Sequence, residues 1–399
     1  MAGNLAGFEF IDRNGVLVTG AQVDYNGQPA GYTADPQEDI TYISKHDNQT
    51  LWDNNTYKTP VETSMAERVR VQNVGLSTVL LGQGVPFMHA GSDLLRSKSF
   101  DRDSYNSGDW FNKLDFTYQS NNYGVGLPVA GKNLDNWPIM QPLLANPALL
   151  PAQSDIETSA VLFQELLAMR ASSNLFRLET SSEIQGRVVF HNTGLGQLPG
   201  LIVMSIDDRD LPTDLDSAIE FIVVLVNAND EAQTFSNADL YGLPLSLHRV
   251  QTQSVDEIVK GATYESATGT FMVPGRTTAV FVYYEPETRI HFLIEDVQML
   301  VDNGDLAANK ATVLFTFLEG ALKELEKGKP KQAIKQLEQF IQQVEILVAQ
   351  GNLAAAYGDA LIQDAAYIIE QIGLANSMTL NSINLTGTQH IFLPVMNNK

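Results

Sequence analysis

The arrangement of residues 40–88 constrains the fold more than any other stretch of the chain. Residues 40–43 are β-branched or aromatic, residues 64–81 combine apolar side chains with a Ser64–Glu67 capping box, and residues 85–88 form a second short apolar run. Strands favour β-branched and aromatic residues, and Ser followed three residues later by Glu is typical of a helix start. This order predicts a strand–helix–strand unit with a right-handed crossover, and therefore a parallel sheet.

A polar segment containing His46 and Asp47 directly follows the first strand, and the apolar Leu51-Trp52 comes soon after it. A short strand that delivers His and Asp at its C-terminal end is how parallel α/β barrels build active sites. The complete block, residues 42–53, resembles the last conserved active-site motif of the α-amylase superfamily (glycoside hydrolase family 13), in the form found in pullulanase-type α-1,6-glucosidases. The resemblance is specific again over residues 84–112.

The resemblance implies a fold. Residues 40–43 and 85–88 would be the seventh and eighth strands of a (β/α)8 TIM barrel, so the chain would hold the C-terminal part of that barrel. Residues 1–39, which contain several turn pairs, are expected to form a loop between the sixth and seventh strands.

The resemblance also implies roles for individual residues. Asp47 matches the carboxylate that stabilises the transition state, and His46 matches its hydroxyl-binding neighbour. Lys45 and Asn48 are the adjoining substrate-binding candidates. From the His-Asp pair alone, a surface pair that caps a loop is the alternative.

Retaining glycoside hydrolysis needs two further carboxyl groups, a nucleophile and an acid/base, about 5–5.5 Å apart. In the resembled family these groups lie on barrel strands four and five, and no segment of this sequence matches them. We therefore expect the chain to be a C-terminal fragment of a longer enzyme that is inactive alone. Whether the chain by itself is an enzyme stays open at this point.

A long polar segment, residues 93–153, is expected to be the elaborated loop after the last barrel strand, because long irregular loops are usually functional. Asp103, Asp109, Trp110 and Asn112 are its candidate substrate-groove residues, since an aromatic face stacks on a sugar ring and polar groups bond its hydroxyls. The alternative is that Trp110 and Phe111 only pack the loop against the rest of the protein. A helix is expected at residues 155–171.

The remaining sequence predicts two more domains. The expected fold is therefore multidomain, with an α/β domain followed by an all-β domain and an all-α domain. After the barrel part (1–176), an antiparallel β-sandwich is expected over 177–286, with strands at 187–191, 201–206, 221–226, 246–250, 270–273 and 278–283. Residues 288–375 carry an internal repeat, because the pattern that starts at Val297 recurs at Val344, 47 residues later (344 − 297). This predicts a four-helix module, which resembles a FIMAH domain. Residues 376–399 form a tail with a strand-like run at 390–395.

Composition limits the partners. The net charge of −22 argues against nucleic acid, which requires a basic face, and fits a neutral polysaccharide. The absence of cysteine excludes disulfides and thiolate metal sites. No apolar run reaches the roughly 18 residues of a membrane span. The first residues lack the basic start and apolar core of a signal peptide, although the resemblance implies an extracellular or cell-surface parent enzyme.

The expected function is hydrolysis of α-1,6-glucosidic linkages in pullulan, amylopectin or limit dextrin, with retention of configuration. The alternative is a non-catalytic protein whose β-sandwich and helical module bind carbohydrate or a partner. No cofactor is required by any motif. The resemblance allows Ca²⁺, for which no ligands can be assigned, since Asp302-Asn303-Gly304-Asp305 lacks the alternating oxygen ligands of an EF-hand loop.

Overall fold

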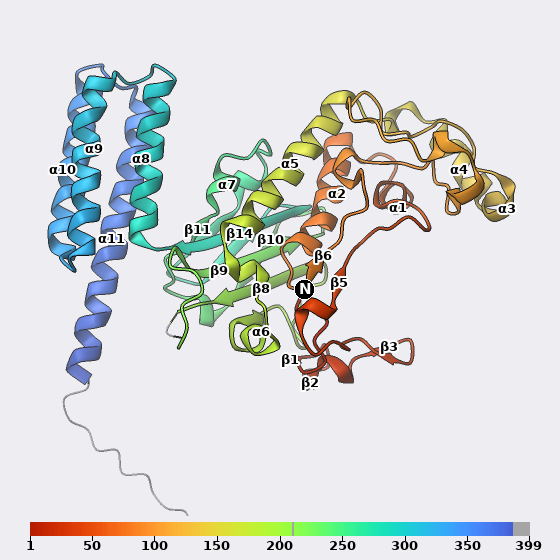
Figure 1. Ribbon diagram of the computed structural model, residues 1–399, viewed down its shortest axis with the longest axis horizontal. Helices are drawn as coiled ribbons and strands as arrows, with labels where there is room; N and C mark the ends of the chain where they lie inside the picture. Colours follow the sequence, from red (N-terminus) through yellow and green to blue (C-terminus); the bar gives the residue numbers. More distant parts are fainter. Residues whose placement is uncertain (210, 386–399) are drawn as a thin grey trace, which may run out of the picture. The chain divides into compact units, whose positions relative to one another are not determined.

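The structure is a computed structural model that describes residues 1–209 and 211–385, with the side chains of 374–385 excepted. It divides into two compact units, one from Met1 to Tyr283 and one that begins at Tyr284 (Figure 1). None of the described helices combines the length and the apolar character that a membrane span requires.

The first 39 residues contain two short antiparallel hairpins, so the expectation of a plain loop was wrong. The strands are β1 (Glu9–Ile11), β2 (Leu17–Thr19), β3 (Asp24–Tyr25) and β4 (Gln28–Pro29). Asn26 and Gly27 both have positive φ, 53° and 82°, as the tightest hairpin turn requires. Strands of two or three residues are too short to show an alternating pattern, which is why the sequence revealed only the turns.

The predicted strand–helix–strand unit is present. Strands β5 (Ile40–Thr41) and β6 (Val85–Pro86) pair in parallel, and α2 (Met65–Leu80) lies between them in the chain (Figure 1). The Ser64 hydroxyl caps α2 by accepting from the Glu67 amide. A further helix, α1 (Leu51–Lys58), was not predicted, and it contains the end of the block 42–53.

The β5–β6 sheet has two strands, so the described residues form no closed barrel. The segment 93–153 is also more regular than expected. It contains two helices that were not predicted, α3 (Ala130–Asn133) and α4 (Trp137–Leu144), and it is followed by the predicted helix α5 (Gln153–Ser172). Helix α5 packs against α2.

Two sheets form the β part of the first unit. Five of the six predicted strands are found near their predicted positions, whereas the prediction for 246–250 was partly wrong, because β11 covers residues 246–247 and a short helix begins at Arg249. One sheet has the order β11-β14-β9-β8-β7 and the other β10-β13-β12. Side chains of both sheets share one core, including Phe221, Phe271 and Phe281. The bounds are β7 (Val188–Phe190), β8 (Leu201–Asp207), β9 (Ile219–Asn227), β10 (Gln233–Ser236), β11 (Ser246–Leu247), β12 (Thr263–Glu265), β13 (Thr270–Val273) and β14 (Thr277–Tyr284), with the short helices α6 (Ser181–Arg187) and α7 (Arg249–Thr252). Strands β10 and β12 were missed.

Up to residue 385, where the described part of the chain ends, the second unit contains four helices around one apolar core: α8 (Pro286–Asp302), α9 (Ala308–Glu326), α10 (Pro330–Ala349) and α11 (Ala355–Leu385). Gly304 and Gly351, the equivalent glycines of the repeat, follow α8 and α10 with φ of 80° and 69°. Only glycine adopts this conformation without strain, so each ends its helix in the same way. The strand-like run 390–395 lies outside the described residues.

Candidate functional site

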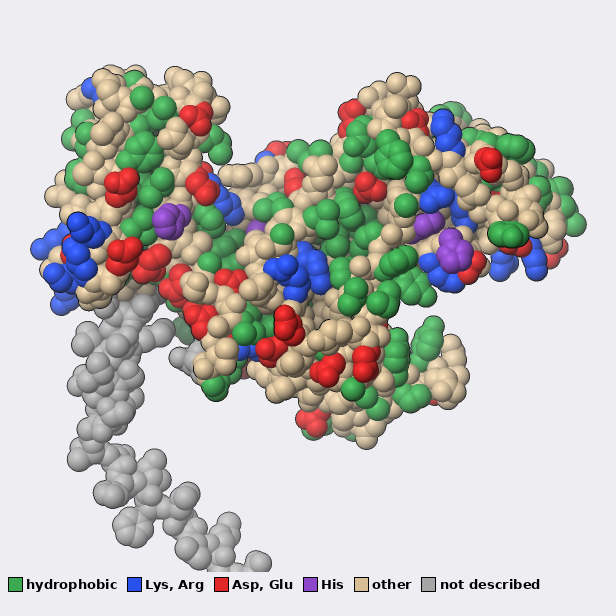
Figure 2. All heavy atoms as spheres, viewed as in Figure 1, with side chains coloured by type: hydrophobic (Ala, Val, Ile, Leu, Met, Phe, Trp, Pro, Cys, Tyr) green, Lys and Arg blue, Asp and Glu red, His purple; other side chains and the backbone are tan. Residues whose placement is uncertain are grey.

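The turn after β5 brings three of the predicted residues together. The Lys45 Nζ atom donates to Asp47 Oδ2 at 2.5 Å, and His46 Nε2 lies 3.5 Å from Asp47 Oδ1. The three side chains face solvent, and that of His46 is 85% exposed. Figure 2 shows histidine side chains beside acidic and basic ones near the loop that joins β5 to α1. The turn therefore presents an imidazole, a carboxylate and an ammonium group to a ligand in solvent.

Asp47 is held in its ionised form. The hydrogen bond from Lys45, followed by the charges of Lys45 and His46, keeps the pKa of Asp47 below its ordinary value. The same contact raises the pKa of Lys45. A carboxylate that stays charged at neutral pH can bond sugar hydroxyls and stabilise positive charge at a reacting carbon.

Two buried charged residues lie behind this turn. The Lys98 side chain is 1% exposed, and its Nζ atom donates to the His46 carbonyl at 2.8 Å. Asp53, on α1, is fully buried and accepts from Ser97 Oγ at 2.5 Å and from the Lys98 amide at 2.8 Å. Burial raises the pKa of Asp53, and these hydrogen bonds oppose the shift. The turn thus rests on a buried polar network that connects α1 to residues 97–98.

The segment 95–100 has an unusual backbone. Leu95, Ser99 and Phe100 have φ of 55°, 49° and 69°, in the left-handed region that side chains other than glycine avoid. Such residues cost on the order of 1–3 kcal/mol each and persist only where the surroundings fix them. Phe100 is fully buried, with its ring 4.3 Å from that of Tyr57 and 5.6 Å from that of Tyr123. The packing of Phe100 helps to hold Ser97 and Lys98 beneath the turn.

His89, in the loop after β6, is a neutral hydrogen-bonding residue. The Arg96 guanidinium donates to His89 Nε2 at 3.1 Å, and because a guanidinium cannot accept, the His89 proton is on Nδ1, facing Ser44 Oγ at 3.3 Å. Burial, and then the charge of Arg96, lowers the pKa of His89 to about 4. Arg96 also donates to the Asn112 carbonyl at 3.2 Å, so it joins the His89 loop to the next candidate residues.

The predicted substrate-groove residues lie on the segment 103–112. The side chains of Asp103, Asp109 and Trp110 are exposed. The Asn112 amide is already paired within the loop, since its Oδ1 accepts from the Ser104 hydroxyl at 2.9 Å and its Nδ2 donates to the Ser104 carbonyl at 3.1 Å. Of the four predicted residues of this loop, Asp103, Asp109 and Trp110 are therefore the ones that can reach a ligand without rearrangement.

Backbone and buried side chains connect the two groups. The Asn48 amide donates to the Arg102 carbonyl at 3.0 Å, and Lys98 bonds the His46 carbonyl from the same segment. Sequence reasoning missed Asp53, Lys98 and Arg96, because charged residues in a polar run suggest a solvated loop. The one available signal was Thr50 with an acidic residue three positions later, which marks a helix start and would have placed Asp53 on a helix.

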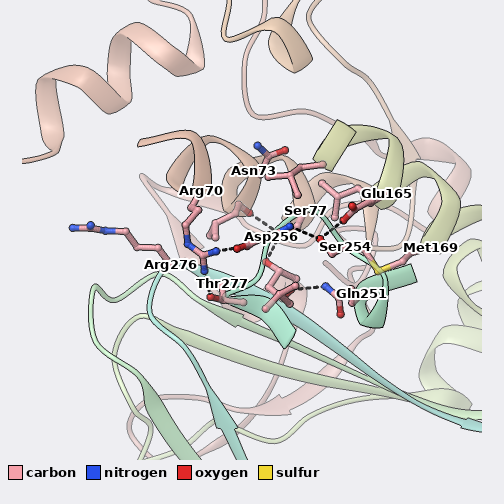
Figure 3. A pocket seen from close by; sticks show the side chains of 15 residues that line it. Arg70, Asn73, Ser77, Glu165, Met169, Gln251, Ser254, Asp256, Arg276 and Thr277 are labelled. Carbon is pink, nitrogen blue, oxygen red and sulfur yellow. Dashed lines mark hydrogen bonds and ion pairs between the residues drawn. The ribbon is translucent and has the colours of Figure 1, made fainter. Parts of the chain in front are cut away.

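A separate cavity of about 50 Å³ lies between α2, α5 and the β part of the first unit (Figure 3). Arg70 of α2 points toward Asp256 and Thr277, bonds both side chains, and donates to the Gly275 carbonyl at 3.1 Å. This network joins the two-sheet β part of the first unit to α2 and does not include the turn at residues 45–48. In the described part of the chain, no group of three or more His, Cys, Asp or Glu side chains is placed to hold a metal ion.

Comparisons with known proteins give a consistent result. Residues 118–284 match the family described as alpha-1,6-glucosidases, pullulanase-type, C-terminal, and residues 292–370 match the FIMAH domain. The chain is 48% identical to pullulanase 1, chloroplastic, of Arabidopsis thaliana over 287 residues, which cover 71% of this chain and 30% of that protein. It is 43% identical to the pullulanase of Klebsiella pneumoniae over 281 residues, which cover 70% of this chain and 26% of that protein.

The comparison with solved structures agrees with the sequence comparisons. The maltotriose complex of PulA from Klebsiella pneumoniae superimposes with a TM-score of 0.67 and 43% identity, over 71% of this chain and 30% of that one. The chain thus spans less than a third of the length of these relatives. It combines a C-terminal region of the pullulanase-type α-1,6-glucosidase family with a FIMAH domain.

Proposed function

We propose that this chain contributes one wall of the active site of a starch- or pullulan-debranching glycoside hydrolase, in which Asp47 stabilises the transition state of α-1,6-glucosidic hydrolysis. The observation that carries the proposal is the exposed, ionised Asp47 beside His46, on a turn held from behind by buried residues. The similarity to a pullulanase that was solved with maltotriose supports an α-glucan ligand.

Replacement of Asp47 by Asn tests this role. The substitution keeps the size of the side chain and removes the charge that favours an oxocarbenium-like transition state, so kcat should fall by roughly a hundredfold to a thousandfold while KM changes little. The measurement is pullulan hydrolysis by a chimera in which residues 1–284 replace the matching segment of the Klebsiella pneumoniae pullulanase. The matched control is Asp115→Asn, a partly exposed carboxylate of the same unit that is likewise kept ionised by its hydrogen bonds and lies outside the turn. A chimera with Asp47→Asn that keeps its kcat would remove Asp47 from the mechanism.

The chain alone should bind α-glucan without cleaving it, because the nucleophile and the acid/base of the retaining mechanism have no counterpart in its motifs. Maltotriose should perturb the NMR signals of His46, Asp47 and Trp110, and purified chain should release no reducing ends from pullulan. Turnover comparable to that of the Klebsiella enzyme would contradict this expectation.

We propose further that residues 1–176 are part of a (β/α)8 barrel, with a β-sandwich at 177–286 and a helical module at 288–375. The parallel pair β5–β6 supports the barrel, as do the apolar side chains around it that remain 41–54% exposed: Ile40, Tyr42, Ile43, Val85 and Phe87. Parallel sheets are covered on both faces in known folds, so neighbouring strands would bury these side chains. A location outside the cell remains a prediction from the resemblance.

Hydrogen exchange can test how incomplete this sheet is. The amides of Val85 and Phe87 donate to the Asp39 and Thr41 carbonyls, but their strand is short and flanked by exposed apolar side chains. They should exchange roughly a hundredfold faster, or more, than the central amides of β8 and β9, which are buried in the sandwich. NMR-detected exchange on a monomeric sample measures both sets. Equal protection would mean that the β5–β6 sheet is complete as it stands.

A further inference from the structure

The Lys98 side chain is in an unusual environment for a lysine. It is 1% exposed, yet lysine is almost never fully buried unless its charge is compensated. Its neighbour Asp53 accepts from the Lys98 backbone amide and from Ser97 Oγ, whereas the Lys98 ammonium donates to the carbonyl of His46. The ammonium therefore bonds the backbone of the very turn that presents His46 and Asp47.

A contribution to stability alone does not explain why a lysine is buried at this position. Burial lowers the pKa of Lys98, while the charges of Asp53 and Asp101 oppose that shift, so keeping the ammonium charged has an energetic cost that methionine would avoid. The strained backbone at Leu95 and Ser99 adds to that cost. Strained residues cluster at functional sites, and a binding site needs neighbouring residues that fix the geometry of its side chains.

We propose that Lys98 is a positioning residue for the glucan-binding turn: its buried ammonium fixes the His46 carbonyl, and thereby the directions of the His46 and Asp47 side chains, while Asp53 and Ser97 hold Lys98 in place. This inference rests on the proposed function, because it assigns Lys98 to the same site. Lys98 does not touch the ligand. It acts through the backbone of residues 46–47, and its charge also contributes to keeping Asp47 ionised.

Lys98→Met in the full chain is the direct test, since methionine fills the space of the lysine stem without the ammonium. The affinity for maltotriose, measured by calorimetry, should fall about tenfold, the effect expected of one lost positioning contact. The pKa of the Asp47 carboxyl, followed by carbon NMR, should rise, because the Lys98 charge is gone and the Lys45–Asp47 contact loosens.

Arg170→Met is the matched control. Arg170 is also a buried cation, and it donates to the backbone carbonyls of Leu80 at 2.7 Å and Gly82 at 2.9 Å, at the end of α2. It should lower the melting temperature and leave both the maltotriose affinity and the Asp47 titration as in the wild type. This separates a loss of stability from a loss of positioning.

If Lys98→Met does not fold, Ser97→Ala is the second variant. It keeps the ammonium and removes the hydrogen bond from the Ser97 hydroxyl to Asp53, which helps to fix the backbone of residues 97–98, so it should give a smaller change of the same sign in both readouts. A folded Lys98→Met with unchanged affinity and unchanged Asp47 titration overturns the inference, as does a folded Ser97→Ala without either change. If wild-type chain fails to bind maltotriose, the proposed function fails, while the Asp47 titration still decides whether Lys98 positions the turn.

Discussion

Asp208→Asn is expected to lower the free energy of unfolding of the first unit by about 3–5 kcal/mol, because it removes one partner of a buried ion pair. The side chains of Arg187 and Asp208 are 5% and 1% exposed. One Asp208 oxygen bonds the Arg187 guanidinium, and the other accepts from the amides of Leu215 and Asp216, both at 2.9 Å. The asparagine side chain would carry no negative charge, so the buried Arg187 guanidinium would lose its counter-charge. Its NH2 group would also face an N–H donor, either Arg187 or the amides of Leu215 and Asp216.

Tryptophan fluorescence during denaturation in urea measures this change selectively. The three tryptophans, Trp52, Trp110 and Trp137, all lie in the first unit, so unfolding of the helical unit does not contribute. Asp207→Asn is the control in the neighbouring residue. Asp207 pairs with Arg209 at 2.8 Å, but its side chain is 34% exposed, and such pairs contribute about 0–1 kcal/mol. Equal losses in the two variants would show that burial of the Arg187–Asp208 pair is not what stabilises the sheet.

The sequence predicted elements that carry a long or distinctive local signal. The capping box at Ser64 located α2, and the repeated glycines Gly304 and Gly351 located the helix ends of the second unit. Strands β8 and β9 were evident because they are long and almost wholly apolar. In each case the pattern within one segment was sufficient, because backbone conformation and burial there follow from neighbouring residues.

The candidate site was only half predictable. His46 and Asp47 were found through the resemblance of their block, whereas Lys98 and Asp53 were missed, although both are buried beneath the same turn. A charged residue becomes buried only when tertiary contacts supply its partners, and Asp53 and Ser97 are 44 positions apart. The strands β10 and β12 were missed for a related reason, since each is held by pairing with β13 rather than by its own composition.

The first unit is also expected to lose stability as the pH falls from about 6.5 to about 4, and His248 should account for about 3 kcal/mol of that loss. His248 is 2% exposed. Its Nδ1 atom accepts from the Val250 amide at 3.1 Å, so the proton of the neutral ring is on Nε2, facing Ser172 Oγ at 3.1 Å. Protonation of Nδ1 would break the bond from Val250 and place a charge in the core.

The direction of the stability change follows from the pKa values of His248 in the folded and unfolded chain. Burial lowers the pKa of His248 from its ordinary value of 6.5 to about 4. As the pH falls through 6.5, His248 becomes protonated in the unfolded chain but stays neutral in the folded chain. The free energy of unfolding therefore decreases until the pH reaches about 4, where the folded chain is protonated as well. A gap of about 2.5 pH units corresponds to about 3 kcal/mol. His89 adds a smaller loss in the same range, because it is half-exposed, while the raised pKa of Asp53 acts in the opposite direction.

Urea denaturation followed by tryptophan fluorescence at several pH values between 7.5 and 4.5 tests this expectation. His248→Gln can accept from Val250 and donate to Ser172 without titrating, so its stability should depend on pH much less than that of the wild type. His46→Gln is the control, because His46 is 85% exposed and should leave the wild-type dependence intact. If His248→Gln loses as much stability on acidification as the wild type, the acid sensitivity comes from other groups. If the dependence of stability on pH is reduced in His248→Gln but not in His46→Gln, the loss of stability in acid comes mainly from one buried imidazole, which lies beside Ser172 of α5.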